Sequence, residues 1–134
     1  MYGIKNTPKR IGNINVSDAQ LTQIVKIQNF TSKNTKQSQP VFFYSDVPGM
    51  YMLVDRVNPT RYDLPFIAST KNKRYEMLQD FIDVKPAFIF EDTSRWAVDG
   101  VNNRQRLPEI ALFINKNYKK IGTIDSTIIY QLHQ

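Results

Sequence analysis

Residues 40–57 read PVFFYSDVPGMYMLVDRV and hold two strongly apolar runs on either side of one turn signal. The runs are Val41–Tyr44 and Tyr51–Val54, and Pro48-Gly49 lies between them. Aromatic and β-branched residues that flank a Pro-Gly dipeptide are typical of a β-hairpin. Because Pro followed by Gly is the chemistry of a type II turn, we expect a bulge or a longer loop over 46–50. The stretch therefore predicts a hairpin at the centre of the hydrophobic core.

The composition is that of one globular domain. The chain has 134 residues, of which 41% are hydrophobic and 22% are charged, enough to build a core without covalent staples. It has no cysteine, so disulfides, thiolate nucleophiles and cysteine metal sites are excluded. No apolar run has the length of a membrane span, and the N-terminus lacks the apolar region of a signal peptide. We therefore expect a cytoplasmic location, or one within a particle assembled there, such as a virion.

The net charge of +6 is concentrated in the first third of the chain. Residues 1–40 carry six basic side chains against Asp18 alone, whereas residues 41–134 carry twelve basic and eleven acidic side chains. Such an asymmetry favours an anionic partner, although a solvated basic segment would also produce it.

Residues 1–16 show no sustained periodicity and predict an extended basic arm ahead of a domain over 17–134. The tip of this arm carries apolar side chains suited to dock on a neighbouring subunit, namely Met1, Tyr2 and Ile4. In the alternative, the arm binds nucleic acid, and the side chains that contact phosphates are Lys5, Lys9 and Arg10.

A helix is predicted over 18–29 because its first turn carries a complete capping signal. Ser17 and Gln20 match the capping box, in which the serine hydroxyl accepts from the Gln20 N–H and the glutamine side chain returns the bond. An apolar face follows with helical spacing, and it contains Leu21, Ile24 and Val25. Residues 31–39 contain no apolar side chain, so we expect a polar linker between this helix and the sheet.

A second helix is predicted over 70–83, where apolar side chains recur with helical spacing. Its first turn carries three positive charges, on Lys71, Lys73 and Arg74. Because the N–H groups at a helix N-terminus bind anions, this cluster is a candidate anion or nucleic-acid site. The alternative is a solvated helix start whose charge is relieved by Glu76 and Asp80 one turn later.

The remaining pattern predicts one more helix and three more strands. The helix is expected over 108–120, with Pro108 at its first position. The strands are expected over 87–90, 95–98 and 124–132. Together with the hairpin, these elements predict a single α+β domain with about five strands in a mixed or mostly antiparallel sheet.

Few residues are available for catalysis. The single histidine is His133, next to the C-terminus, and none of the five glycines belongs to a phosphate-binding loop. These facts argue against a serine–histidine triad, a multi-histidine metal site and a P-loop. We predict no catalytic residue, no metal and no cofactor. The alternative is a metal-dependent nuclease in which Glu91 and Asp92, at a strand end, hold the metal ions.

The predicted strands favour an assembly protein. Their apolar runs do not alternate with polar residues, as in strands covered on both faces. If two helices cover one face, the helix over 18–29 or another subunit covers the other. We therefore predict a non-catalytic structural or adaptor protein of a larger homomeric assembly, for example a connector, terminator or minor protein of a viral or phage particle. The alternative hypothesis is a basic nucleic-acid-binding protein. The expected contact residues are Met1, Tyr2, Ile4, Phe42, Tyr44, Pro48, Met50, Tyr51 and Trp96.

Overall fold

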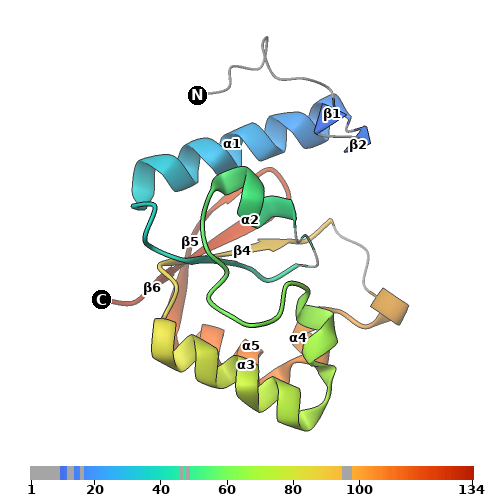
Figure 1. Cartoon of the computed structure of the whole chain (residues 1–134), viewed down its shortest axis with the longest axis vertical. Coiled ribbons are helices and arrows are strands. Elements are labelled where there is room, and N and C mark those ends of the chain that lie inside the picture. The colour runs from blue at the N-terminus through green and yellow to red at the C-terminus, as the bar shows by residue number, and fades with distance from the viewer. Residues whose placement is uncertain (1–9, 12–13, 16, 46, 48, 95–97) are drawn as a thin grey trace.

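The computed structural model describes residues 10–11, 14–15, 17–45, 47, 49–94 and 98–134, and its centre is a four-stranded sheet (Figure 1). The strands follow one another in the order β3 (Val41–Phe43), β4 (Phe88–Asp92), β6 (Thr127–Leu132) and β5 (Tyr118–Ile124). β3 and β4 run parallel, whereas β6 is antiparallel to both of its neighbours. A separate antiparallel pair joins β1 (Arg10–Ile11) to β2 (Ile14–Asn15). The predicted α+β class, single domain and mixed sheet are confirmed, with four strands in place of about five.

Helices cover both faces of this sheet, as Figure 1 shows. One face carries α1 (Asp18–Asn34) and α2 (Gly49–Val54), and the other carries α3 (Lys71–Val84) and α5 (Pro108–Asn117). The second face is therefore covered by the first helix of the same chain. Among the described helices, none combines the length and the apolar character that crossing a bilayer requires.

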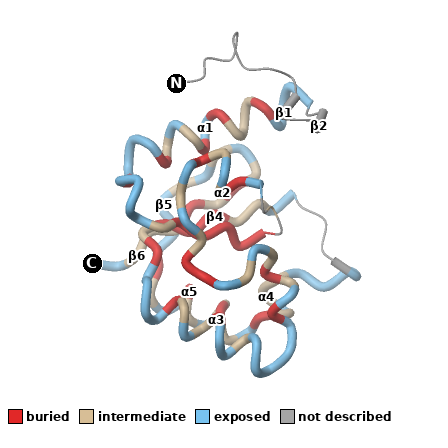
Figure 2. The backbone as a smooth tube through the Cα atoms, in the orientation of Figure 1, coloured by how far each residue is buried: buried red, intermediate tan, exposed pale blue. Residues whose placement is uncertain are grey.

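The sheet divides the hydrophobic core in two, and β3 and β4 are buried on both sides (Figure 2). Phe42 and Ile89 are fully buried among side chains of α3 and α5. Their neighbours Phe43 and Phe90 are buried among side chains of α1 and α2. Because successive strand residues point to opposite faces, a strand between two cores has no polar position, which explains the absence of alternation in the sequence.

The predicted hairpin over 40–57 is wrong in its second half, because residues 49–54 form α2. The buried residues of α2 are Met50 and Val54, whose spacing of four is that of a helix face. A run of only four apolar residues fits a strand or a helix equally well. In the structure the Phe43 N–H, on the outer edge of β3, donates to the Tyr51 hydroxyl over 3.1 Å. α2 thus shields an edge that a second hairpin strand would have paired.

The first helix is longer than predicted. α1 continues to Asn34, so the first residues of the predicted polar linker are helical. Thr31 is fully buried, and its hydroxyl donates to the Ile27 carbonyl over 2.8 Å. A threonine whose hydroxyl bonds within its own helix can be buried without an unsatisfied polar group, so polarity alone did not mark the helix end.

The C-terminal part contains a strand that the sequence pattern did not reveal. α5 ends at Asn117, and residues 118–120 of the predicted helix begin β5. The predicted strand over 124–132 corresponds to β6, which pairs with β5 through a turn at Asp125 with φ 49°. Lys119 and Lys120 in β5 are exposed. Most of the predicted strand over 95–98 lies outside the described residues, and residues 98–100 form a 3-10 turn.

The chain between that turn and α5 forms α4 (Asn103–Arg106). Asn102 caps α4, and its side chain accepts from the Gln105 N–H over 2.9 Å. This short helix carries Arg104 to the end of the sheet.

The capping box of α1 is present as predicted, and it provides a stability test. The Gln20 N–H donates to the Ser17 hydroxyl over 3.2 Å, and the Ser17 N–H donates to the Gln20 side-chain oxygen over 2.9 Å. Replacing Ser17 with alanine removes the first acceptor and is expected to lower the free energy of unfolding by about 1 kcal/mol in urea denaturation. Ser17→Asp is the control and should retain most of the stability. Equal losses in the two variants would contradict the capping role.

Candidate functional site

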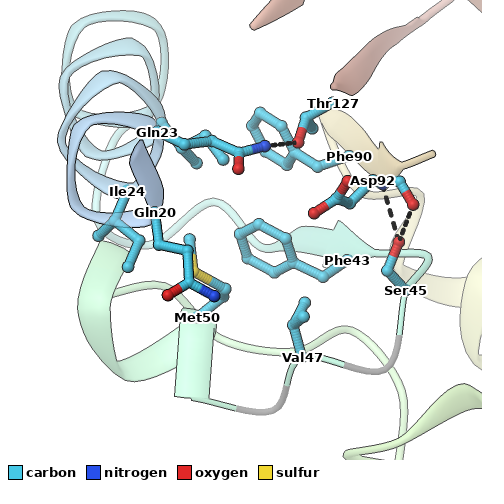
Figure 3. A pocket seen from close by; sticks show the side chains of 11 residues that line it. Gln20, Gln23, Ile24, Phe43, Ser45, Val47, Met50, Phe90, Asp92 and Thr127 are labelled. Atoms are coloured by element: carbon cyan, nitrogen blue, oxygen red, sulfur yellow. Dashed lines mark hydrogen bonds between the residues drawn. The ribbon is translucent and has the colours of Figure 1, made fainter. Parts of the chain in front are cut away.

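A cavity of about 100 Å³ lies between α1, α2 and the sheet, at the carboxyl ends of β3 and β4 (Figure 3). In open α/β sheets ligands bind at the carboxyl ends of strands, so this is where a binding site is expected. The floor consists of Phe43 and Phe90, which are partners in the parallel register and whose rings stack at 5.1 Å. The apolar sides come from Ile24, Ile27, Val47 and Met50.

The wall opposite α2 is polar and joins α1 to the sheet (Figure 3). The side-chain Nε2 of Gln23 donates to the Thr127 hydroxyl over 2.6 Å and to the Ser126 hydroxyl over 3.2 Å. The Ser126 hydroxyl in turn donates to Asp92 Oδ1 over 2.8 Å. Because the Ser126 proton points to Asp92, Gln23 must present its NH₂ group to Ser126, and its side-chain oxygen is directed elsewhere.

Ser45 holds the two parallel strands together at the cavity. The Asp92 N–H donates to the Ser45 hydroxyl over 2.8 Å, which extends the contact between β3 and β4 beyond their ladder. Ser45 is buried, and this bond satisfies its hydroxyl oxygen.

The other candidate carboxylate, Glu91, lies on the opposite face of the sheet. Arg104 donates to it from Nε over 2.9 Å and also donates to the Tyr130 hydroxyl over 2.7 Å. The guanidinium carbon lies 5.8 Å from the ring centre of Tyr44 and 5.6 Å from that of Tyr130. Burial opposes the charge of Arg104, but the bonds to Glu91 outweigh this effect and raise the pKa of the guanidinium.

The nuclease alternative needs carboxylates that converge on shared metal ions. Glu91 and Asp92 do not converge, because consecutive strand residues face opposite sides and each side chain has its own network. In the part of the chain that the structure describes, no three histidine, aspartate or glutamate residues gather to hold a metal ion.

The basic cluster at the start of α3 is partly neutralised. Arg74 forms an ion pair with Glu109 of α5 over 2.8 Å and donates to the Ser69 carbonyl over 2.6 Å. Lys71 lies 6.0 Å from the Tyr75 ring centre, and Lys73 is exposed. The three side chains therefore do not point to one common site.

The acids expected to relieve this cluster act elsewhere. Asp80 binds Arg61 over 3.0 Å, and Glu76 accepts from the Tyr62 hydroxyl. Burial opposes ionisation of Asp80, but hydrogen bonds from Arg61 outweigh it and lower the pKa of the carboxyl.

The predicted contact residues divide into three groups. Phe42, Tyr44 and Met50 are buried by this chain's own helices. Tyr51 is partly buried and holds the β3 edge. The remaining contact residues lie outside the described residues, and they are Met1, Tyr2, Ile4, Pro48 and Trp96. The predicted phosphate-binding residues Lys5 and Lys9 also lie outside them. Arg10 belongs to β1.

Several tyrosines should make the fold sensitive to alkali. Burial raises the pKa of Tyr44, Tyr51 and Tyr118, and it also raises that of Tyr130 with help from Glu91. A raised pKa in the folded state means that the neutral phenol is favoured there. Its contribution to stability is present below the unfolded value of about 10 and is lost as the pH rises through the folded value.

We therefore expect the free energy of unfolding to fall steeply above about pH 10. The measurement is urea denaturation across the alkaline range, with phenolate absorbance recorded in parallel. The variant Tyr51→Phe should show a shallower decline than the parent chain. Ionisation of all tyrosines near pH 10 in the folded protein would contradict the expectation.

Asp92 has a sequence signal as a candidate site residue, whereas nothing in the sequence marks Gln20, Gln23, Ser45 and Thr127 as cavity residues. Glutamine, serine and threonine have no diagnostic spacing, and these four come from α1, from the segment after β3 and from β6, which lie far apart in the chain. The Gln20 capping signal predicted the helix start and, with it, one rim of the cavity.

Comparison with known proteins gives a fold and no family. No protein-family model and no curated protein matches the chain. A solved structure that is similar is the C-terminal globular domain of an oligosaccharyltransferase from Archaeoglobus fulgidus. The TM-score is 0.51 with 6% sequence identity, over 90% of this chain and 100% of that one. At this identity the likeness concerns the fold alone.

Proposed function

We propose that the chain is a non-catalytic adaptor protein of a larger homomeric assembly, of which a viral or phage particle is one example. The observation that supports the proposal is the arrangement of the carboxylates and the cavity at the carboxyl ends of β3 and β4. There the carboxylates of Glu91 and Asp92 are held in separate networks on opposite faces, whereas an apolar-floored cavity lies open beside them. Such an end is suited to hold a partner group rather than to transform one.

The sheet edges argue against assembly by strand pairing. β5 is an edge strand that carries Lys119, Lys120 and a bulge between Lys120 and Gly122. Lysines and bulges on an edge prevent pairing with another chain. The β3 edge is shielded by Tyr51. Contacts through side chains of the N-terminal segment and of α2, where Met52 is 74% exposed, fit this arrangement better.

Size-exclusion chromatography with light scattering tests the proposal. We expect a mass above the 15.6 kDa of one chain, falling on dilution. Removing residues 1–9 should weaken the association, because the arm supplies the apolar side chains of Met1, Tyr2 and Ile4. A strict monomer at every concentration would refute the proposal.

Nucleic-acid binding is the second candidate, and the charge of the N-terminal third favours it. Retention of RNA or DNA on a filter should then weaken steeply with salt. Replacement of Lys5, Lys9 and Arg10 by glutamine should abolish it. The variant Lys71→Gln is the control on the body of the protein and should change retention little.

A further inference from the structure

The cavity and the N-terminal segment of the chain lie at the same end of α1. Gln20, in the first turn of α1, borders the cavity (Figure 3). Arg10 is the register partner of Asn15, which lies two residues before Ser17, the cap of α1. Residues 1–9 therefore join the described part of the chain beside the start of α1, at the end where the cavity opens.

We propose that residues 1–9 of a second copy of this chain dock on the cavity and insert the side chain of Ile4. The inference rests on the proposed homomeric assembly and names the contact that holds two copies together. An extended chain from Arg10 back to Ile4 spans about 20 Å, twice the width of a helix. Because segment and cavity lie at one end of α1, a two-fold axis beside that end places the segment of each copy at the cavity of its partner. The exchange is then reciprocal and yields a closed dimer.

The size of the cavity selects Ile4 among the apolar side chains of this segment. A protein cavity of about 150 Å³ holds benzene, so a cavity of about 100 Å³ suits a branched aliphatic group and excludes the larger ring of Tyr2. Met1 is long and unbranched, and its burial costs more rotamer entropy than that of a β-branched side chain. Ile4 is therefore the side chain of residues 1–9 that fits the cavity best.

The lining gives an aliphatic group apolar contacts and keeps its own hydrogen bonds. The floor consists of the Phe43 and Phe90 rings, which stack at 5.1 Å. On the polar wall, Gln23 donates its NH₂ group to Thr127 and Ser126. An isoleucine side chain can enter above the rings without breaking these bonds, so apolar area is removed from water at no cost in wall hydrogen bonds.

The first test compares substitutions of Ile4 in the full chain by sedimentation equilibrium. Ile4→Ala removes most of the inserted group and should raise the dimer dissociation constant at least about tenfold. Ile4→Val keeps a branched group and should stay closer to the parent chain. Ile4→Trp is the matched control, because an indole adds apolar area but exceeds the cavity, so it should weaken the dimer as alanine does. A tryptophan variant that associates as tightly as the parent chain would overturn the insertion.

Filling the cavity from within should have the same effect. Ile24→Phe and Val47→Phe each enlarge a lining side chain, one on α1 and one in the segment after β3, so one folded variant is sufficient. The filled variant should raise the dissociation constant at least about tenfold. Leu112→Ala is the control, because Leu112 is 69% exposed on α5, on the other face of the sheet, and should change association little. Unchanged association in a folded, filled variant would refute the site.

Mixed samples decide between a second copy and the same chain as the source of the segment. The chain has no cysteine, so Asn6→Cys carries a single nitroxide label close to Ile4 and leaves Ile4 in place. Labelled chains are mixed with parent chains that carry a nitrogen isotope for NMR. We expect the label to broaden the signals of the Thr127 N–H and the Gln23 side-chain amide and to leave that of Leu112 sharp. Broadening that occurs only when label and isotope share one chain would overturn the exchange between copies.

These outcomes separate the contact from the adaptor function. Association that survives both Ile4→Trp and the filled cavity would retain the assembly and refute this contact. A parent chain that sediments as a strict monomer at every concentration would refute both.

Discussion

Replacing Arg104 with methionine is expected to lower the free energy of unfolding by about 2–3 kcal/mol. Arg104 joins α4 to the sheet through Glu91 and Tyr130, and the Glu91 side chain is only 14% exposed. Removing the guanidinium leaves this carboxylate in a partly buried place with one hydrogen bond, from the Tyr130 hydroxyl, which is costly. The expected loss is smaller than that for a fully buried ion pair because the Arg104 side chain is 33% exposed.

Two further variants decide whether the uncompensated charge is the cause. The double variant Glu91→Leu with Arg104→Met removes both charges and should recover part of the loss in urea denaturation. Lys26→Met breaks the exposed pair with Asp125 and should cost less than about 1 kcal/mol. If Arg104→Met costs no more than Lys26→Met, the network does not stabilise the fold.

The same variants bear on the nuclease alternative. If Glu91 were held for metal chemistry, its replacement by leucine in the double variant would abolish a metal-dependent activity. We expect no such activity in the parent chain, which an assay with Mg²⁺ or Mn²⁺ checks directly.

The helices whose starts were predicted correctly have a sequence signal that lies within their own first turn. α1 begins at a capping box formed by Ser17 and Gln20, and α5 begins at Pro108, so each start is encoded locally. The prediction of a strand in the second half of the hairpin was wrong because no such local signal exists there. Residues 51–54 have no local feature that selects a strand or a helix, and the outcome depends on β4, which lies far along the chain and takes the place beside β3.

The candidate site was predictable only in part for a similar reason. Asp92 was a candidate because it ends a strand. Its neighbours Ser126 and Thr127 come from the β5–β6 hairpin. The sequence pattern did not predict this hairpin, because it assigned the start of β5 to a helix and only β6 to a strand. A site composed of amides and hydroxyls has no spacing rule, and only the topology brings its parts together. Local sequence patterns were therefore sufficient to predict the fold class but not the cavity.

Replacing Phe42 with alanine is expected to cost about 4 kcal/mol, the largest effect of a single substitution considered for this chain. Phe42 is fully buried, and its ring meets that of Phe81 edge-on at 4.6 Å between centroids. Its loss would leave a void between the sheet and α3 and remove an aromatic pair. Phe42→Leu, which fills most of the void, should cost roughly half as much and remain folded if the alanine variant does not.

The sequence pattern predicted Phe42 as a contact residue, whereas the structure places it in the core. The same substitution distinguishes these two roles. A core residue lowers the unfolding free energy at every protein concentration, whereas a contact residue changes the association and leaves the monomer stable. Met52→Ala, at a position 74% exposed, is the matched control and should alter monomer stability by less than about 0.5 kcal/mol. Urea denaturation at two protein concentrations distinguishes the two roles. A Phe42→Ala variant with unchanged stability and altered association would show that this sheet face contacts another subunit rather than α3 and α5.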